Sequence, residues 1–126
     1  MRIDTVRTYC LAKPGVEETF PFDETTLAFK VAGKMFLLAA LENVPLTINI
    51  KCDPARAVEL RERYEEVQPG YHMNKKMWNT VTLNGVIPDR TIREWIDDSY
   101  ALVVAGLPKK IQAELALAAS KKSRPE

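Results

Sequence analysis

The feature that most constrains the fold of this chain is a change in the spacing of its apolar residues. Before residue 14 they recur at the spacing of one helical face, as Ile3, Val6 and Cys10 do. From residue 26 they alternate with polar residues in TLAFKV and again in LTINIK, with the more apolar KMFLLAAL between them. Alternation puts every second side chain on one face of a strand. Three strands in succession therefore predict an antiparallel sheet with one buried face.

Helical spacing returns after these strands. Asp53 and Pro54 predict the start of a helix that continues to about residue 66, because the carboxylate caps free amides and proline fits the first turn. MWNTVTL predicts one more strand, and Asn84-Gly85 a connection to a long helix from about residue 89. The residues expected to be buried on that helix are Ile92, Trp95, Ile96, Ser99 and Val103. The order predicts an α+β fold, a two-layer sandwich with a single antiparallel sheet backed by helices.

Charge and cysteine content restrict the partners and the compartment. The formal net charge is +1, which is too small by itself to hold a polyanion, so a nucleic-acid site needs locally clustered lysines. Cys10 and Cys52 form no CxxC pair and are expected to be buried free thiols. The N terminus lacks a signal-peptide core, and no apolar run approaches a membrane span. We expect a cytoplasmic protein without membrane contact.

The stretch PGYHMNKKMWNTV, residues 69–81, combines the only histidine with two adjacent lysines and a tryptophan. Together with FKVAGKMFLL, NIKCDPARAVELRERY and PDRTIREWIDDSYALVVAGLPKK, it resembles the MmcQ/YjbR family of small bacterial proteins. The resemblance covers residues 1 to about 110, which are expected to form a single domain. Residues 111–126 lie outside it, and their Ala/Leu-rich start predicts a helical tail that frays at its end. It also implies a frataxin/CyaY-like fold and a DNA-binding role through a double-wing arrangement of hairpins. The chain departs from many relatives at Met77, where they carry histidine.

If helices cover one face of the sheet, the outward side chains form the other. These positions are Ala28, Lys30, Phe36, Asn49, Lys51, Trp78, Thr80 and Thr82. Lysines neutralise phosphates, and aromatic faces stack on unpaired bases. Turns at Lys34 and at Lys75-Lys76 would add basic wings, and Trp78 would offer a stacking surface. The predicted nucleic-acid site, with DNA as the possible partner, comprises Lys30, Lys34, Lys51, His72, Asn74, Lys75, Lys76 and Trp78.

The same residues also allow a role without nucleic acid. Asn74 and Asn79 can bond backbone groups where the loop enters the strand, and His72 can be a turn residue. Trp78 and Phe36 can close a small second core under the C-terminal helical tail, or form a dimer patch. The alternative is thus a protein-interaction or self-associating module, such as a homodimer, that uses the same face.

Enzyme chemistry is not predicted. One histidine excludes HExxH and any two-histidine metal site. The chain contains no GxSxG motif, no P-loop and no glycine-rich dinucleotide fingerprint. We therefore expect no catalytic residues, no metal and no small-molecule cofactor.

Overall fold

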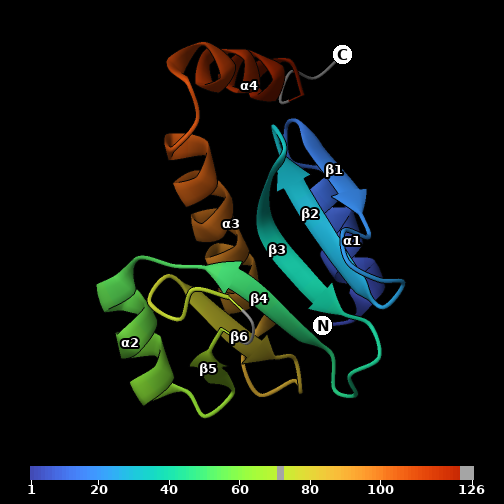
Figure 1. The fold of residues 1–126 in the computed structure, drawn as a ribbon, viewed down its shortest axis with the longest axis vertical. Helices are drawn as coiled ribbons and strands as arrows, with labels where there is room; N and C mark the ends of the chain where they lie inside the picture. The colour runs from blue at the N-terminus through green and yellow to red at the C-terminus, as the bar shows by residue number, and fades with distance from the viewer. Residues whose placement is uncertain (71–72, 123–126) are drawn as a thin grey trace.

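The computed structural model describes residues 1–70 and 73–122, and within them the chain forms one sheet and four helices. The six strands are all antiparallel to their neighbours and lie in the order β1-β2-β3-β4-β6-β5 (Figure 1). They are β1 (Val16–Thr19), β2 (Thr26–Val31), β3 (Lys34–Ala40), β4 (Thr47–Lys51), β5 (Val67–Pro69) and β6 (Trp78–Thr82). The predicted α+β class with a single antiparallel sheet is confirmed.

The helices are α1 (Ile3–Leu11), α2 (Pro54–Arg63), α3 (Asp89–Ala105) and α4 (Lys109–Lys122). α1 and α3 lie on the same side of the sheet, and α2 lies beside β5 and β6 (Figure 1). The main core fills the space between this side of the sheet and α1 and α3, and the buried residues of α2, Ala57 and Leu60, also belong to it. The opposite face of the sheet carries no helix among the described residues.

The two edge strands, β1 and β5, are not predicted by the sequence pattern. β1 reads VEET and β5 reads VQP, and they are 4 and 3 residues long. An edge strand pairs on one side only, so it tolerates charged residues and proline without an apolar alternation. Pairing with β2 and with β6 makes these short segments strands.

A β-bulge in β3 reverses one expected orientation. Phe29 pairs with Leu37 and Lys30 with Met35, so Phe36 is an extra residue on its strand. The bulge turns Phe36 into the main core, where it is fully buried and meets a tyrosine of α3 edge-on. The prediction that Phe36 faces outward is therefore wrong, because simple alternation fails at a bulge.

α2 begins as predicted and ends sooner. Asp53 accepts a hydrogen bond from a first-turn amide at 3.4 Å, and Pro54 occupies the first turn. The helix ends at Arg63 rather than near residue 66. Tyr64 takes an extended backbone there, and its ring packs edge-on against Trp95 of α3 with 5.2 Å between centroids.

α3 supplies the centre of the main core. Its buried residues are those that the sequence predicts: Ile92, Trp95, Ile96, Ser99 and Val103. The Ser99 hydroxyl donates to the backbone carbonyl of Phe36 at 2.5 Å and accepts from the backbone amide of Lys51 at 2.8 Å. One buried hydroxyl thus hydrogen-bonds a backbone group in each of two strands and connects α3 to β3 and β4.

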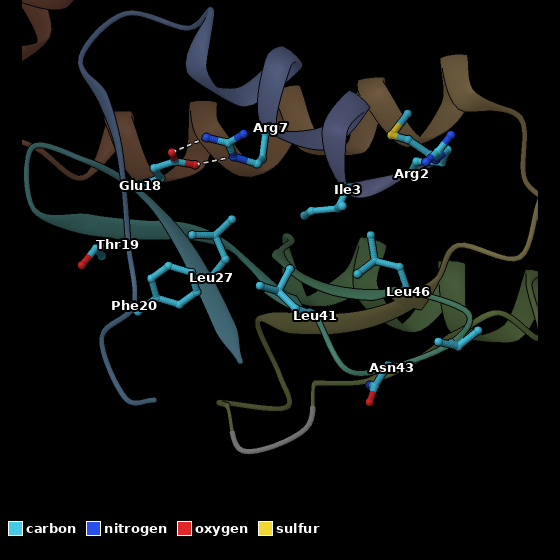
Figure 2. A pocket seen from close by; sticks show the side chains of 12 residues that line it. Arg2, Ile3, Arg7, Glu18, Thr19, Phe20, Leu27, Leu41, Asn43 and Leu46 are labelled. Atoms are coloured by element: carbon cyan, nitrogen blue, oxygen red, sulfur yellow. Dashed lines mark hydrogen bonds and ion pairs between the residues drawn. The ribbon is translucent and has the colours of Figure 1, made fainter. Parts of the chain in front are cut away.

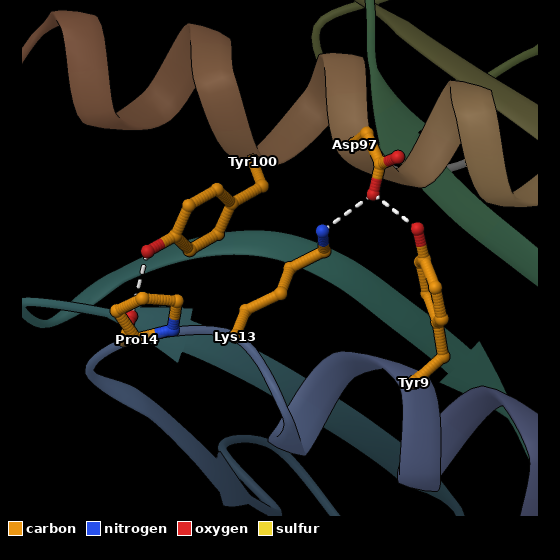
Figure 3. Close-up of polar contacts among 5 residues, drawn as sticks. All are labelled: Tyr9, Lys13, Pro14, Asp97 and Tyr100. Atoms are coloured by element: carbon orange, nitrogen blue, oxygen red, sulfur yellow. Dashed lines mark hydrogen bonds and ion pairs between the residues drawn. The ribbon is translucent and has the colours of Figure 1, made fainter. Parts of the chain in front are cut away.

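A polar cluster joins α1 to α3 (Figure 3). Asp97 accepts hydrogen bonds from the Tyr9 hydroxyl at 2.6 Å and from the Lys13 ammonium at 2.5 Å. Tyr100 donates to the backbone carbonyl of Pro14 at 2.6 Å. Burial, together with the hydrogen bond to Asp97, raises the pKa of Tyr9 to about 12. The cluster holds the end of α1 against α3.

Both cysteines are buried free thiols, as predicted. Burial raises the pKa of Cys10 to about 12, which keeps this thiol neutral inside the core.

α4 lies across one end of the sheet (Figure 1), with the Leu115 side chain against Gly15. In the part of the chain that the structure describes, no helix has the length and apolar character needed to cross a bilayer.

Candidate nucleic-acid interface

The sheet face opposite α1 and α3 is hollowed into a groove of about 910 Å³. Its floor carries the hydroxyl and amide groups of Thr47, Asn49 and Thr80 beside the apolar Leu38. The β1–β2 loop lines one side, and the other side is lined by Gln68, Pro69, Met73 and Lys75. Since α4 lies across the end of the sheet, it leaves this groove open (Figure 1). We call it the open-face groove.

Trp78 lies on the predicted face but is covered. It is 9% exposed and packs with Ala28 and Leu38 in a second, smaller core. Partly buried methionines pack against this cluster: Met35, Met73 and Met77. The prediction that Trp78 offers a stacking surface for bases is therefore wrong. It closes a small second core, as the alternative allowed, but Phe36 lies in the main core and no described residue of α4 belongs to the second core.

Lys30 and Lys51 share the outward face, as predicted. Cross-strand partners lie on the same face of a sheet. Lys51 is opposite Trp78 and Lys30 is opposite Met35, and both partners belong to the second core. Glu17 of β1 is the other neighbour of Lys30, so its carboxylate offsets part of the charge at this end of the sheet.

Lys34 lies at the β2–β3 hairpin tip, as predicted, but on the other side. It pairs with Val31, which is fully buried in the main core. Partners share a face, so Lys34 belongs to the helix side of the hairpin. Lys34 is exposed at the tip, and its strand position faces the helix side rather than the face of Lys30 and Lys51, because the bulge between the tip and the middle of β3 changes the alternation.

Asn74 builds the turn that carries the two adjacent lysines. Its side-chain oxygen accepts a hydrogen bond from the Lys76 amide at 3.0 Å, and its carbonyl accepts from the amides of Met77 and Trp78 at 3.1 and 2.9 Å. The backbone-bonding role considered for Asn74 is confirmed. Lys75 and Lys76 are both exposed at this turn, and Lys75 lines the open-face groove.

Gly70 permits the chain to pass close to β6. Its amide donates to the Trp78 carbonyl at 2.8 Å. A Cβ atom at position 70 would lie 2.7 Å from the Trp78 Cβ and 2.8 Å from that carbonyl oxygen. Packing against β6 therefore explains the glycine of the stretch at residues 69–81.

Arg61 is a site residue that the sequence reasoning missed. Its charge pattern on α2 indicates a solvated face, yet Nε donates to Asn79 Oδ1 and Nη2 to the Lys75 carbonyl, both at 2.8 Å. Asn79 is buried and donates to the Ala57 carbonyl at 3.3 Å. Arg61 thus anchors the lysine turn to α2. The sequence feature that could have indicated this role is the position of Arg61 directly after the buried Leu60.

The far wall of the groove is acidic. Asp23 accepts hydrogen bonds from the Thr25 amide, the Thr25 hydroxyl and the Thr26 amide at 2.8 to 3.0 Å. These bonds, that of the Thr25 amide first, lower the pKa of Asp23 and keep it ionised. The groove is therefore polarised, with Asp23 on one wall and Lys75 on the other.

Over residues 1–70 and 73–120, none of the lysines on the open face forms an ion pair: Lys30, Lys51, Lys75 and Lys76. Within the same ranges, no three His, Cys, Asp or Glu side chains are grouped so as to hold a metal ion. His72, also predicted for this site, lies outside the described residues. The arrangement combines free ammonium groups with hydroxyl and amide groups, which suits an anionic partner with hydrogen-bonding edges.

Comparison with known proteins places the chain in a family. The family model described as YjbR matches residues 11–102. The chain is 40% identical over 110 residues to the protein named "Uncharacterized protein YbdF" of Escherichia coli O157:H7, covering 86% of this chain and 89% of that one. It is 36% identical over 111 residues to "Uncharacterized protein YjbR" of E. coli strain K12, covering 87% and 93%.

Solved structures show the same fold. The crystal structure of Deinococcus radiodurans protein DR2400 has a TM-score of 0.86 and 41% identity, covering 90% of this chain and 87% of that one. The crystal structure of a Pseudomonas syringae protein has a TM-score of 0.70 and 25% identity, covering 81% and 98%. The match to the YjbR model and the identity with full-length relatives lead to one conclusion: this chain belongs to the YjbR family.

Proposed function

We propose that this protein binds nucleic acid through the open face of its sheet. The observation that carries the proposal is the set of lysines without ion pairs in the described chain, at Lys51 and at the Lys75-Lys76 turn beside the open-face groove. Ammonium groups neutralise phosphates, and here they border a polar floor in which the Thr80 hydroxyl already donates to Asn49 Oδ1 at 2.5 Å. DNA is the partner that the family resemblance implies.

The proposed contact is mainly electrostatic. Trp78 is covered, so bases have no indole to stack on, and the lysines supply the attraction. Few cations take part, so we expect weak binding that falls steeply as salt rises. The proposed role is cytoplasmic and non-catalytic. From the family resemblance we also propose that the fold is of the frataxin/CyaY type. In the double-wing arrangement that the resemblance implies, the Lys75-Lys76 turn would be one wing.

Fluorescence anisotropy tests the proposal. The full chain is titrated into labelled single-stranded and double-stranded DNA over a series of salt concentrations. For duplex DNA, Lys75→Ala/Lys76→Ala should reduce the slope of log K against log salt by about 2, because each phosphate contact contributes roughly 0.9. Lys109→Ala/Lys110→Ala removes the same charge from α4 and should leave the slope unchanged.

Two outcomes would contradict the proposal. If neither DNA binds at low salt, the nucleic-acid function is wrong. If DNA binds and the Lys75→Ala/Lys76→Ala variant behaves like the unmodified protein, the function stands but the interface is elsewhere. Circular dichroism of each variant establishes that a change in binding does not come from unfolding.

A protein-interaction or self-associating module is the second candidate, and one observation favours it. Phe22, on the wall of the groove, is 67% exposed, and the floor beside it includes Leu38 and Ala40. Exposed aromatic side chains of this kind are enriched at protein interfaces. Sedimentation velocity distinguishes the two: a dimer that Phe22→Asp dissociates, in a protein that binds no DNA, would support association through this face.

A further inference from the structure

A second cleft, of about 870 Å³, lies at the start of α1 on the helix side of the sheet (Figure 2). Ile3 of α1 approaches it from one side, and Leu27, Leu41 and Leu46 approach from the sheet and the β3–β4 connection. These four side chains continue the main core outward, where no further element covers it in the described chain. We call this space the α1 cleft. Its volume falls within the range of small-molecule sites.

The rim of the α1 cleft is apolar and open to solvent. Phe20, directly after β1, is 52% exposed, and Val44 in the β3–β4 connection is 95% exposed. Large apolar side chains that border an apolar cleft leave surface that a ligand can remove from water. The α1 cleft therefore has an apolar floor and an apolar entrance.

Among the described charged groups that line the α1 cleft, one cation has no ion pair. The N-terminal ammonium of Met1 lies 3.7 Å from Asp89 Oδ1. At one end Arg7 donates to both carboxylate oxygens of Glu18, at 2.8 and 2.5 Å (Figure 2). This bidentate hydrogen bonding raises the pKa of Arg7 and lowers that of Glu18, so the two charges neutralise each other. Arg2, toward the other end, is exposed and forms no ion pair in the described part of the chain.

An apolar cleft with one unpaired guanidinium at its edge is complementary to an amphiphilic anion. A carboxylate at the end of a hydrocarbon body places the body against Ile3, Leu27 and Leu41 and the charge beside Arg2. We propose that the α1 cleft binds a small monocarboxylate with an alkyl or arylalkyl body. The site lies on the opposite side of the sheet from the open-face groove, so it does not depend on the proposed nucleic-acid function.

Isothermal titration of the full chain with decanoate tests the proposal, and decanol and decyltrimethylammonium serve as neutral and cationic probes of equal chain length. Decanoate should bind saturably below its micellar range and more tightly than either other probe. Arg2→Glu should weaken decanoate by about tenfold, through loss of the charge-assisted hydrogen bond, and leave decanol nearly unchanged. Lys110→Glu makes a similar charge change on α4 and should have no effect.

A pair of phenylalanines identifies which cleft is occupied. Phe20→Ala should weaken decanoate binding by about fivefold, because half of that ring is free to cover a ligand. Phe22→Ala, in the wall of the open-face groove, should leave it unchanged. The proposal is overturned if decanoate does not saturate, if decyltrimethylammonium binds as tightly, or if the two phenylalanine variants lose the same affinity. Both rings are exposed, so neither variant should unfold the protein.

Discussion

At the scale of single residues, packing explains most of the signature stretch. Gly70 allows the chain to pass close to β6, and the Asn74 side chain accepts a hydrogen bond within the turn. Trp78 fills the second core, and the buried Asn79 side chain donates to a backbone carbonyl of α2. Lys75 is exposed at the groove, and its backbone carbonyl accepts a hydrogen bond from Arg61. Most residues of this motif-like stretch are thus structural, and the lysines are the residues that we propose contact nucleic acid.

Gly70→Ala should destabilise the protein by about 1 to 3 kcal/mol, because the new methyl group would overlap backbone atoms that cannot move aside. The backbone carbonyl of Trp78 would be 2.8 Å from the added Cβ. The midpoint of urea unfolding measures the loss. Gly106→Ala is the matched control, since its Cβ would meet its nearest neighbour at 3.6 Å in a right-handed backbone conformation. Equal stability of the two variants would show that the close approach at Gly70 is not tight.

At the scale of elements, α2 holds the lysine turn through one side chain. Arg61 bonds the carbonyl of Lys75 and the buried amide oxygen of Asn79. Since Asn79 also bonds the backbone of α2, the helix, the turn and β6 form one connected unit. The position of the proposed phosphate contacts therefore depends on a helix that does not touch the open face.

Arg61→Ala should lower the free energy of unfolding by about 1 to 3 kcal/mol, because the Asn79 oxygen would stay buried without its donor. The same variant should weaken DNA binding, since the turn loses its anchor. Arg63→Ala removes an exposed arginine from the same helix, where it stacks on Tyr64 at 5.4 Å, and should cost about 0.5 to 1 kcal/mol. Urea unfolding and anisotropy measure the two effects. If Arg63→Ala weakened DNA binding as much, general charge rather than anchoring would explain the result.

The elements that the sequence predicts well are those in which buried residues recur at a regular spacing. α3 buries one continuous stripe, so its five core residues follow from spacing alone. β1 and β5 carry no such repeat because each pairs on one edge only. The bulge at Phe36 likewise leaves no local trace, since either register of KMFLLAAL offers apolar residues to both faces.

At the scale of the whole molecule, α4 decides which surfaces stay open. Leu115 lies against Gly15, so the helix packs on one end of the sheet and leaves the open-face groove uncovered. The two clefts lie on opposite sides of the sheet, and each is bordered by an exposed phenylalanine. Asn43 in the β3–β4 connection lines both clefts, so they approach each other around this end of the sheet.

Leu115→Ala should weaken the packing of α4 on the sheet by about 1 kcal/mol in free energy, because a partly buried side chain loses its contact with the end of the sheet. Leu117→Ala is the control on the same helix, since Leu117 is 59% exposed. Hydrogen exchange followed by mass spectrometry should show faster exchange in α4 for Leu115→Ala only. Faster exchange in both variants would indicate that helix propensity, not docking, protects this segment.

The sequence by itself determined the α+β class, the central strands, the buried stripe of α3 and the outward positions of Lys30 and Lys51, because each follows from a period of two or of about 3.6 residues. Only the tertiary structure decided that Phe36 turns inward, that Trp78 lies under methionines and that Arg61 holds the lysine turn. These outcomes depend on contacts between residues far apart in the chain, which no local spacing records.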